Sequence, residues 1–309
     1  MREKELKLIL DREKSKGEAK RIFYKQIEVI VDLVNYGSNL VVRTYDSSKR
    51  RLEDAIVIGV LLKQVVSMLD AVEVLVSHGV IKPASLQTRC AFEASLYIDF
   101  ILEGDSEQKA NYYYVANLRN TKLWELRHTK GSDEREAFSH VFKDLGDYMS
   151  PYKPELEDKI RKDLENIQEV LSQGRFNEIN EVYERKRTKR VDWYKAYGTK
   201  SLREIAKKVE RLTEYEIFYP TGSEVMHSAS YRDHVQFYKG MLRFEPIRKL
   251  EGADSVLQNI IGIALTSYRS ILKHYRYGEL GNFKRKYMQE WRDGYQSITH
   301  VSYIAEDDK

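Results

Sequence analysis

Two sets of polar side chains lie on otherwise apolar stretches of this sequence and could carry out chemistry. The first lies in residues 84–102, where Arg89 and Glu93 are four positions apart and therefore share one face of a helix. Such an arginine can stabilise a phosphate or a developing negative charge while the carboxylate orients it. The structural alternative is a buried ion pair that joins neighbouring helices, because burying a charge is costly unless it is paired.

The second set lies in the segment TGSEVMHSASYRDH, residues 221–234. Ser223 and His227 are four positions apart there, and Glu224 and His227 are three apart. Histidine is the side chain best suited to proton transfer near neutral pH, although a histidine beside apolar positions can equally be a hydrogen-bonded packing residue. The candidate catalytic residues are therefore His227, Arg89, Glu93 and Ser223.

A metal site is an alternative use of the same residues. Glu-x-x-His on a bundle helix is half of a di-iron carboxylate site, and the chain contains two such pairs. The alternative ligands are Glu93, Glu125, His128, Glu224 and His227. A chain rich in Glu produces such pairs by accident, and His128 lies where a helix is expected to end, so the main interpretation involves no metal and no cofactor.

A basic segment is the candidate for nucleic-acid binding. Residues 183–208 contain ten Lys or Arg and three acids, a local charge of +7 in a chain whose net charge is +4. Aromatic residues lie among these cations, and the combination can bind phosphates and stack bases, although charge runs are usually solvated surface. The candidate RNA-binding residues are Arg185, Lys186, Arg187, Lys189, Arg190, Trp193 and Tyr194.

Long helices must position these residues. The 309 residues include only 5 Pro and 16 Gly, apolar spacing near 3.6 recurs almost throughout, and no strict alternation persists. The predicted fold class is all-α, a multi-helix bundle. Helices are predicted over residues 22–45, 52–77, 84–102, 106–128, 156–172 and 255–275, with Asp105 or Ser106 as the cap of the fourth. A short helix capped by Ser201 and a kink or a fresh helix start at Pro220 and Gly222 are also predicted.

We expect one helical domain over residues 21–277, with a basic, charged insertion around 132–200. A charged helix (1–20) would precede it, and a charged, loosely packed tail (278–309) would follow. The single cysteine, Cys90, excludes an internal disulfide framework and a cysteine-based zinc cluster. The N-terminus lacks a signal-peptide pattern and the longest apolar stretch, residues 55–62, is too short to span a bilayer, so we expect a cytoplasmic protein without membrane association.

In their order along the chain, these features resemble a bacterial all-helical domain family of unknown function (a DUF). The resemblance covers roughly residues 20–275 and rests on Arg-x3-Glu followed by a Trp, a Ser-capped helix and Tyr…Ser-x3-His, here Arg89, Glu93, Trp193, Ser201, Tyr215, Tyr219, Ser223 and His227. That family looks HEPN-like, which implies an up-down helical core with additional helices, found in RNA-cutting toxins and defence proteins. The HEPN pattern Arg-x4–6-His is not met before His227, so Arg89 would have to supply the cation from another helix.

The resemblance implies an effector or accessory protein of a bacterial defence or toxin-type system. Such a protein could act as a metal-independent endoribonuclease or as an RNA-binding protein. In that role His227 would exchange a proton with a ribose 2′-hydroxyl and Arg89 would stabilise the phosphorane. The alternative is a non-catalytic helical interaction module, in which the same side chains form a buried polar network. A ferritin-like di-metal bundle is the third hypothesis. The expected partners are RNA, a protein of the same system and a second copy of the chain.

Overall fold

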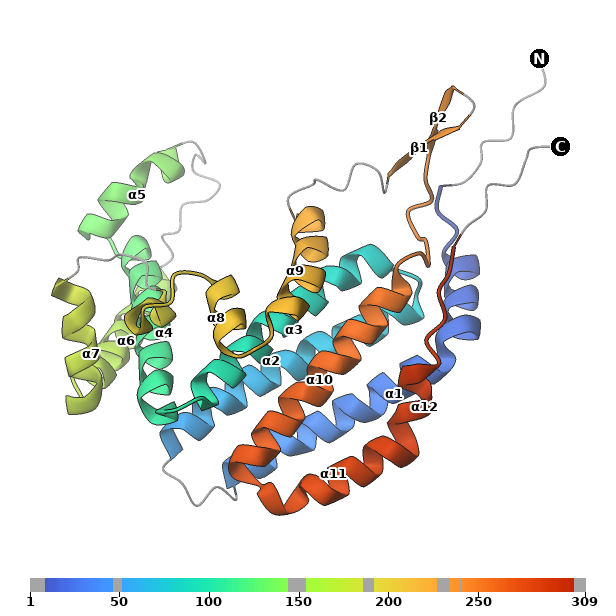
Figure 1. Cartoon of the computed structure of the whole chain (residues 1–309). Coiled ribbons are helices and arrows are strands. Elements are labelled where there is room, and N and C mark those ends of the chain that lie inside the picture. The colour runs from blue at the N-terminus through green and yellow to red at the C-terminus, as the bar shows by residue number, and fades with distance from the viewer. Residues whose placement is uncertain are drawn as a thin grey trace. The chain divides into compact units, whose positions relative to one another are not determined.

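The computed structural model describes residues 9–46, 52–143, 154–185, 192–226, 234–238 and 240–302. The chain divides into two compact units, one formed by residues 1–104 together with 201–309 and the other by residues 105–200 (Figure 1). Nearly all described elements are helices, which confirms the prediction of an all-α, multi-helix fold. The only strands in these ranges form one hairpin.

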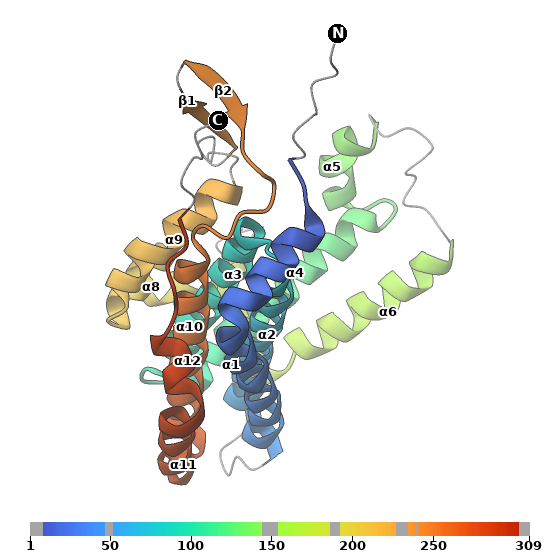
Figure 2. The ribbon, with the colours of Figure 1, turned by 90° about the vertical axis from the view of Figure 1, so that its right-hand side faces the viewer.

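Four long helices form the body of the first unit: α1 (Arg12–Asp46), α2 (Leu52–Ser77), α3 (Ile81–Leu102) and α10 (Ala253–Tyr275). They pack side by side, with α2 next to both α1 and α3, and α10 against α3 (Figure 2). The Tyr268 hydroxyl of α10 is fully buried and donates to the Leu33 carbonyl of α1 at 2.8 Å. A Cβ at Gly37 would overlap the Tyr268 ring, so a glycine is needed where α1 and α10 meet.

Shorter elements complete this unit. The helices α8 (Leu202–Lys208) and α9 (Leu212–Met226) pack on α3. The hairpin of β1 (Val235–Tyr238) and β2 (Met241–Phe244) follows. After α10 the chain forms the 3₁₀-helix η4 (Tyr277–Glu279), α11 (Leu280–Lys286), the π-helix η5 (Tyr287–Trp291) and α12 (Arg292–Gln296).

The helix α2 matches the helix predicted over residues 52–77 and extends well beyond its longest fully apolar stretch, residues 55–62. By length and composition alone, its residues Asp54–Ser77 could cross a membrane. More than half of that window is buried, and α1, α3 and α10 all contact this helix. Its apolar side chains, including Ile58, Leu62 and Leu69, therefore form part of the core of the first unit.

The segment after Gly278 differs from the loosely packed tail suggested by its charge. Phe283 and Trp291 are buried, and the Trp291 indole N–H donates to Asp32 Oδ2 of α1 at 2.6 Å. The Gln26 side chain of α1 donates to the Gly294 carbonyl at 2.8 Å. Two large aromatic side chains, together with these hydrogen bonds, attach a charged segment to α1, because aromatic residues bury a large apolar area.

Local signals place most helix starts correctly. The Asp105 side chain accepts from the Gln108 N–H at 3.0 Å, and the Ser201 hydroxyl accepts from the Glu204 N–H at 3.3 Å, so both predicted caps are confirmed. Of the two alternatives predicted at Pro220 and Gly222, a fresh helix start is wrong, because α9 continues through both residues. A proline inside a helix removes one backbone hydrogen bond, which tertiary packing on α3 can offset.

The second unit is built around α4 (Ser106–His128). This helix contacts α5 (Asp133–Lys143), α6 (Pro154–Leu171), α7 (Gly174–Arg185) and the 3₁₀-helix η2 (Trp193–Tyr197). Aromatic rings form much of its interior: Tyr112 packs edge-on against Tyr183 and Tyr197, and Tyr113 against Trp193. Whereas the predicted charged insertion starts around residue 132, this compact unit starts at Asp105.

Candidate functional site

The helices α3 and α9 approach each other closely at Gly222. A Cβ at this position would lie 2.9 Å from the Cβ of Arg89 and 3.1 Å from the Ser85 carbonyl oxygen. Any side chain here would push the two helices apart. The glycine that suggests a break in the sequence therefore allows the close contact that brings α9 onto the Arg89 side chain.

Arg89 is the centre of the polar cluster between these helices. Its Nε donates to Glu93 Oε1 at 3.2 Å and its Nη2 donates to the Tyr219 hydroxyl at 2.5 Å. Its guanidinium lies over the Tyr219 ring, 4.0 Å from the centroid, and its Nη1 is 3.7 Å from Met226 Sδ. The arginine side chain is only 10% exposed. The predicted Arg89–Glu93 pair is therefore present, and it is joined to α9 through Tyr219.

Tyr219 closes this cluster from the side of α9. Burial, reinforced by the charge of Glu93, raises the pKa of the Tyr219 hydroxyl against the opposing effect of Arg89. The hydroxyl also hydrogen-bonds to Glu93, so arginine, carboxylate and phenol form a ring of contacts. Tyr215 stacks on Tyr219 with the ring centroids 4.6 Å apart, which limits access from one further side.

Of the other two predicted catalytic residues, the structure describes Ser223 but not His227. Ser223 is half-buried on α9, one turn after Tyr219. His227 lies outside the described residues, and so does the side chain of Glu224. Met226, the last described residue of α9, contacts the Arg89 guanidinium. The structure therefore brings Arg89 and Glu93 together with α9, up to the residue that precedes His227.

A second buried arginine, Arg211, which is not among the predicted site residues, lies directly before α9. Arg211 Nη1 donates to Ser95 Oγ and to Asp99 Oδ2, both at 2.7 Å, and its Nη2 donates to Glu214 Oε2 at 2.6 Å. The Ser267 hydroxyl of α10 donates to Ser95 at 2.9 Å, and the arginine side chain is only 7% exposed. The available signal was Ser95 and Asp99, four positions apart on the same helix as Arg89.

The alternative metal ligands are distributed over both units. Glu93 belongs to the first unit, whereas Glu125 and His128 belong to the second. His128 donates a ring N–H to the Trp124 carbonyl at 2.9 Å at the end of α4. In the part of the chain that the structure describes, no three His, Cys, Asp or Glu side chains form a group that could hold a metal ion.

The predicted RNA-binding residues differ in accessibility. Arg185 is exposed at the end of α7, where it pairs with Glu181 at 3.1 Å. Trp193 is buried and Tyr194, half-buried, packs against its edge, so the indole ring is not available to stack on a base. Lys186, Arg187, Lys189 and Arg190 lie outside the described residues.

The second unit also contains a cleft whose lining has more acidic than basic side chains, unlike the basic segment of residues 183–208. It measures about 420 Å³ and is lined by the carboxylates of Asp105, Glu107 and Glu178, together with Arg175. An excess of acidic groups repels phosphates, so this cleft adds no support for RNA binding.

Comparison with known proteins gives a match to a family model. No curated protein and no solved structure matches the chain. A family model, described as a family of unknown function (DUF5677), matches residues 54–237, which is more than half of the chain and includes α3, α9 and the Arg89 cluster. This match confirms the predicted membership of a domain family of unknown function. The chain therefore belongs to the family of unknown function DUF5677.

Proposed function

We propose that this protein is a non-catalytic helical interaction protein, an accessory component of a bacterial defence or toxin-type system acting in the cytoplasm. The observation that carries the proposal is that the Arg89 guanidinium is largely buried and already bonded to other side chains of the protein. The guanidinium is shared between Glu93, Tyr219 and Met226 and stacks on the Tyr219 ring, and the arginine side chain is only 10% exposed. The role assigned to it is to hold α9 on α3.

A phosphate ligand would have to compete with these contacts. Moving Arg89 onto a phosphate would leave Glu93 and the Tyr219 hydroxyl without their charged partner, and a partly buried group that loses its partner costs about 1–3 kcal/mol. A catalytic arginine instead needs donors that point at the position of the developing charge. The cluster therefore suits a fixed structural contact better than a reaction.

The hairpin supplies the surface for the proposed interaction. In its register, Val235 lies opposite Phe244 and Phe237 opposite Leu242, so the four apolar side chains share one face. Phe237 is 71% exposed and Phe244 is 69% exposed. An isolated two-stranded hairpin is marginally stable in water, and an exposed apolar patch of this kind is typical of an interaction site.

The partner that fits this face is a second copy of the chain. The face carries no charge, so nothing in it selects a partner of complementary charge, and it matches itself under twofold symmetry. Two hairpins related by a twofold axis would cover each other's aromatic side chains, as isologous interfaces do. In this proposal, the homo-oligomer expected from the sequence would form through β1 and β2.

The test is the oligomeric state of the purified full-length chain over a range of concentrations. Sedimentation velocity should show a dimer for the wild type and a monomer for the double variant Phe237→Ser/Phe244→Ser. Tyr277→Ser, which changes an equally exposed aromatic residue far along the chain from the hairpin, should remain dimeric. A wild type that stays monomeric at every concentration, or a hairpin variant that still dimerises, would refute this interface.

A metal-independent ribonuclease is the second candidate. The observation in its favour is that Met226, the residue directly before His227, contacts the Arg89 guanidinium. This function predicts RNA cleavage that persists in EDTA and is lost in His227→Ala, while His234→Ala, a change to another histidine of the same segment, remains active. Absence of cleavage by the wild type would support the non-catalytic role. Cleavage lost only in His227→Ala would overturn it.

A further inference from the structure

An open groove lies on the first unit between α10 and the helical segment formed by α11 and η5. Its volume is about 480 Å³, and its apolar lining includes Leu265, Leu280 and the buried Phe283. Small-molecule sites typically measure about 300–1,000 Å³ and are mostly apolar with a few polar groups. Size and lining therefore fit a small ligand.

Three cations line the same groove: Arg269 and Lys273 on α10 and Lys284 on α11. Arg269 and Lys273 follow Leu265 at helical spacing, and Lys284 follows Leu280 in the same way, so each helix presents apolar and cationic side chains on its groove face. The groove thus combines an apolar floor with positive charge.

These cations are not neutralised within the described residues. No carboxylate there pairs with any of the three, whereas the neighbouring Lys286 pairs with Asp32 at 2.8 Å and Arg276 pairs with Glu279. Like charges four positions apart on a helix repel each other. An anion bound in the groove would relieve this repulsion.

The backbone beside the groove is unusual. Tyr287, which lines it, begins the π-helix η5, and single π-helical turns inside helices frequently occur at functional sites. On the facing helix, a Cβ at Gly262 would lie 3.2 Å from the Tyr295 hydroxyl. The glycine therefore keeps space open beside a phenol that can donate a hydrogen bond to a ligand.

We propose that this groove binds a small anionic amphiphile, a molecule with one carboxylate or phosphate group and a hydrocarbon body. The cations Arg269, Lys273 and Lys284 hold the anionic head group, and the apolar floor covers the hydrocarbon. The groove uses neither the Arg89 cluster nor the hairpin, so this inference is independent of the proposed interaction function.

Calorimetry on the full-length protein tests both halves of the ligand. Dodecanoate and dodecyl phosphate, used below their critical micelle concentrations, probe the two head groups, dodecanol supplies the same chain without charge, and acetate supplies a charge without the chain. Dodecanoate should bind and raise the melting temperature, and its affinity should fall with added salt. Dodecanol should bind at least several-fold more weakly, and acetate should give no measurable binding.

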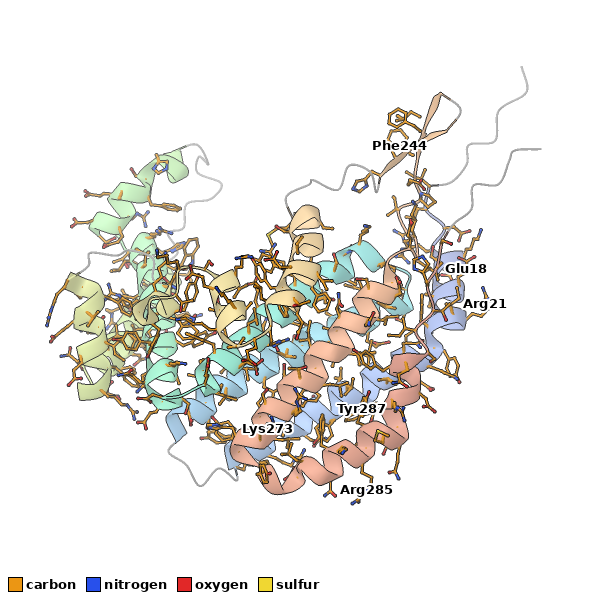
Figure 3. All side chains as sticks on the ribbon, in the orientation of Figure 1. Glu18, Arg21, Phe244, Lys273, Arg285 and Tyr287 are labelled. Carbon is orange, nitrogen blue, oxygen red and sulfur yellow. The ribbon has the colours of Figure 1, made fainter. Side chains whose placement is uncertain are left out.

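Charge variants test the head-group site. Each of Arg269→Gln, Lys273→Gln and Lys284→Gln should weaken dodecanoate binding about two- to fivefold, as expected for partly exposed charge pairs. Arg285→Gln is the matched control, because Arg285 lies on the outer side of α11 while Lys273 and Tyr287 lie between the helices (Figure 3). All four substituted side chains are exposed, so these variants should fold normally.

Three results would overturn the inference. The first is no binding of dodecanoate or dodecyl phosphate to the wild type. The second is equal affinity for dodecanol and dodecanoate, because the cations would then have no role. The third is a triple variant that binds dodecanoate as well as Arg285→Gln does. A difference between dodecanoate and dodecyl phosphate would identify the preferred head group.

Discussion

Two arginines hold the two ends of α9 on α3, one of them on α3 and the other directly before α9. Arg89 extends from α3 to Tyr219 and Met226 in the second half of α9, whereas Arg211 precedes α9 and extends back to Ser95 and Asp99 of α3. Arginine suits both positions because its planar fork can donate several hydrogen bonds from one buried charge. Each contact can be tested by a single substitution.

Tyr219→Phe should lower the free energy of unfolding by about 1–3 kcal/mol, because Arg89 Nη2 loses its acceptor while the aromatic ring remains. Denaturant-induced unfolding followed by circular dichroism measures the change. Tyr215→Phe is the control, since this ring stacks on Tyr219 without a hydroxyl contact to Arg89, and it should change stability by less than about 0.5 kcal/mol. Equal effects of the two variants would contradict the assigned hydrogen bond.

Arg211→Met should be more damaging, with an expected loss of about 3–5 kcal/mol, because it leaves the Asp99 carboxylate buried without its charged partner. Arg203→Met provides a comparison at a solvent-exposed pair with Glu216, where the loss should stay below about 1 kcal/mol. Both values come from the same unfolding measurement. Similar losses at the two sites would show that the Arg211 network adds little.

At the scale of the helix, α9 shows why local signals mislead. Pro220 and Gly222 both disfavour a helix interior, yet α9 runs from Leu212 to Met226 without a break. Gly222 is required by the neighbouring helix, because only glycine fits against Arg89 and Ser85. A residue that weakens the helix alone therefore strengthens its packing.

Gly222→Ala should consequently destabilise the protein by about 1–3 kcal/mol, although alanine is the better helix former, because its methyl group would overlap α3. Gly59→Ala on α2 is the control, since no atom lies within 4 Å of a Cβ there, and it should stabilise the protein by up to about 1 kcal/mol. Melting temperatures of the two variants should shift in opposite directions. A rise for Gly222→Ala would refute the close approach.

For the whole molecule, the abundance of tyrosine has a consequence for pH stability. The chain has 22 Tyr, and burial raises the pKa of several of them, including Tyr36, Tyr113, Tyr268 and Tyr295. Tyr268 is fully buried and donates to the backbone of α1. In the unfolded chain the same side chains titrate near their ordinary pKa of about 10.

The folded protein therefore keeps protons that the unfolded chain releases above about pH 10, and the stabilisation is lost as the pH rises through the raised folded values. The free energy of unfolding should change little on account of these groups below about pH 10 and fall steeply above it. Urea unfolding at a series of pH values, with tyrosinate absorbance as a second probe, measures this. Stability that stays constant well above the ordinary tyrosine pKa would contradict it.

The sequence by itself determined the all-α fold, the caps at Asp105 and Ser201, and the pairing of Arg89 with Glu93. Each of these depends on atoms within one or two helical turns, so spacing along the chain is enough to predict it. Local reasoning allows a fresh helix start at Pro220, where α9 continues, and it suggests loose packing for the segment in which Phe283 and Trp291 are buried. In both cases contacts with other helices outweigh local preference.

Only the tertiary structure decided what surrounds these residues. Tyr219 lies 130 positions from Arg89, and Asp99 lies 112 positions from Arg211, so no spacing rule could connect them. The groove between α10 and α11 likewise depends on three cations that only helix packing brings together. Local spacing predicts which side chains share a helix face. Which other helix packs on that face depends on segments that are distant in the sequence.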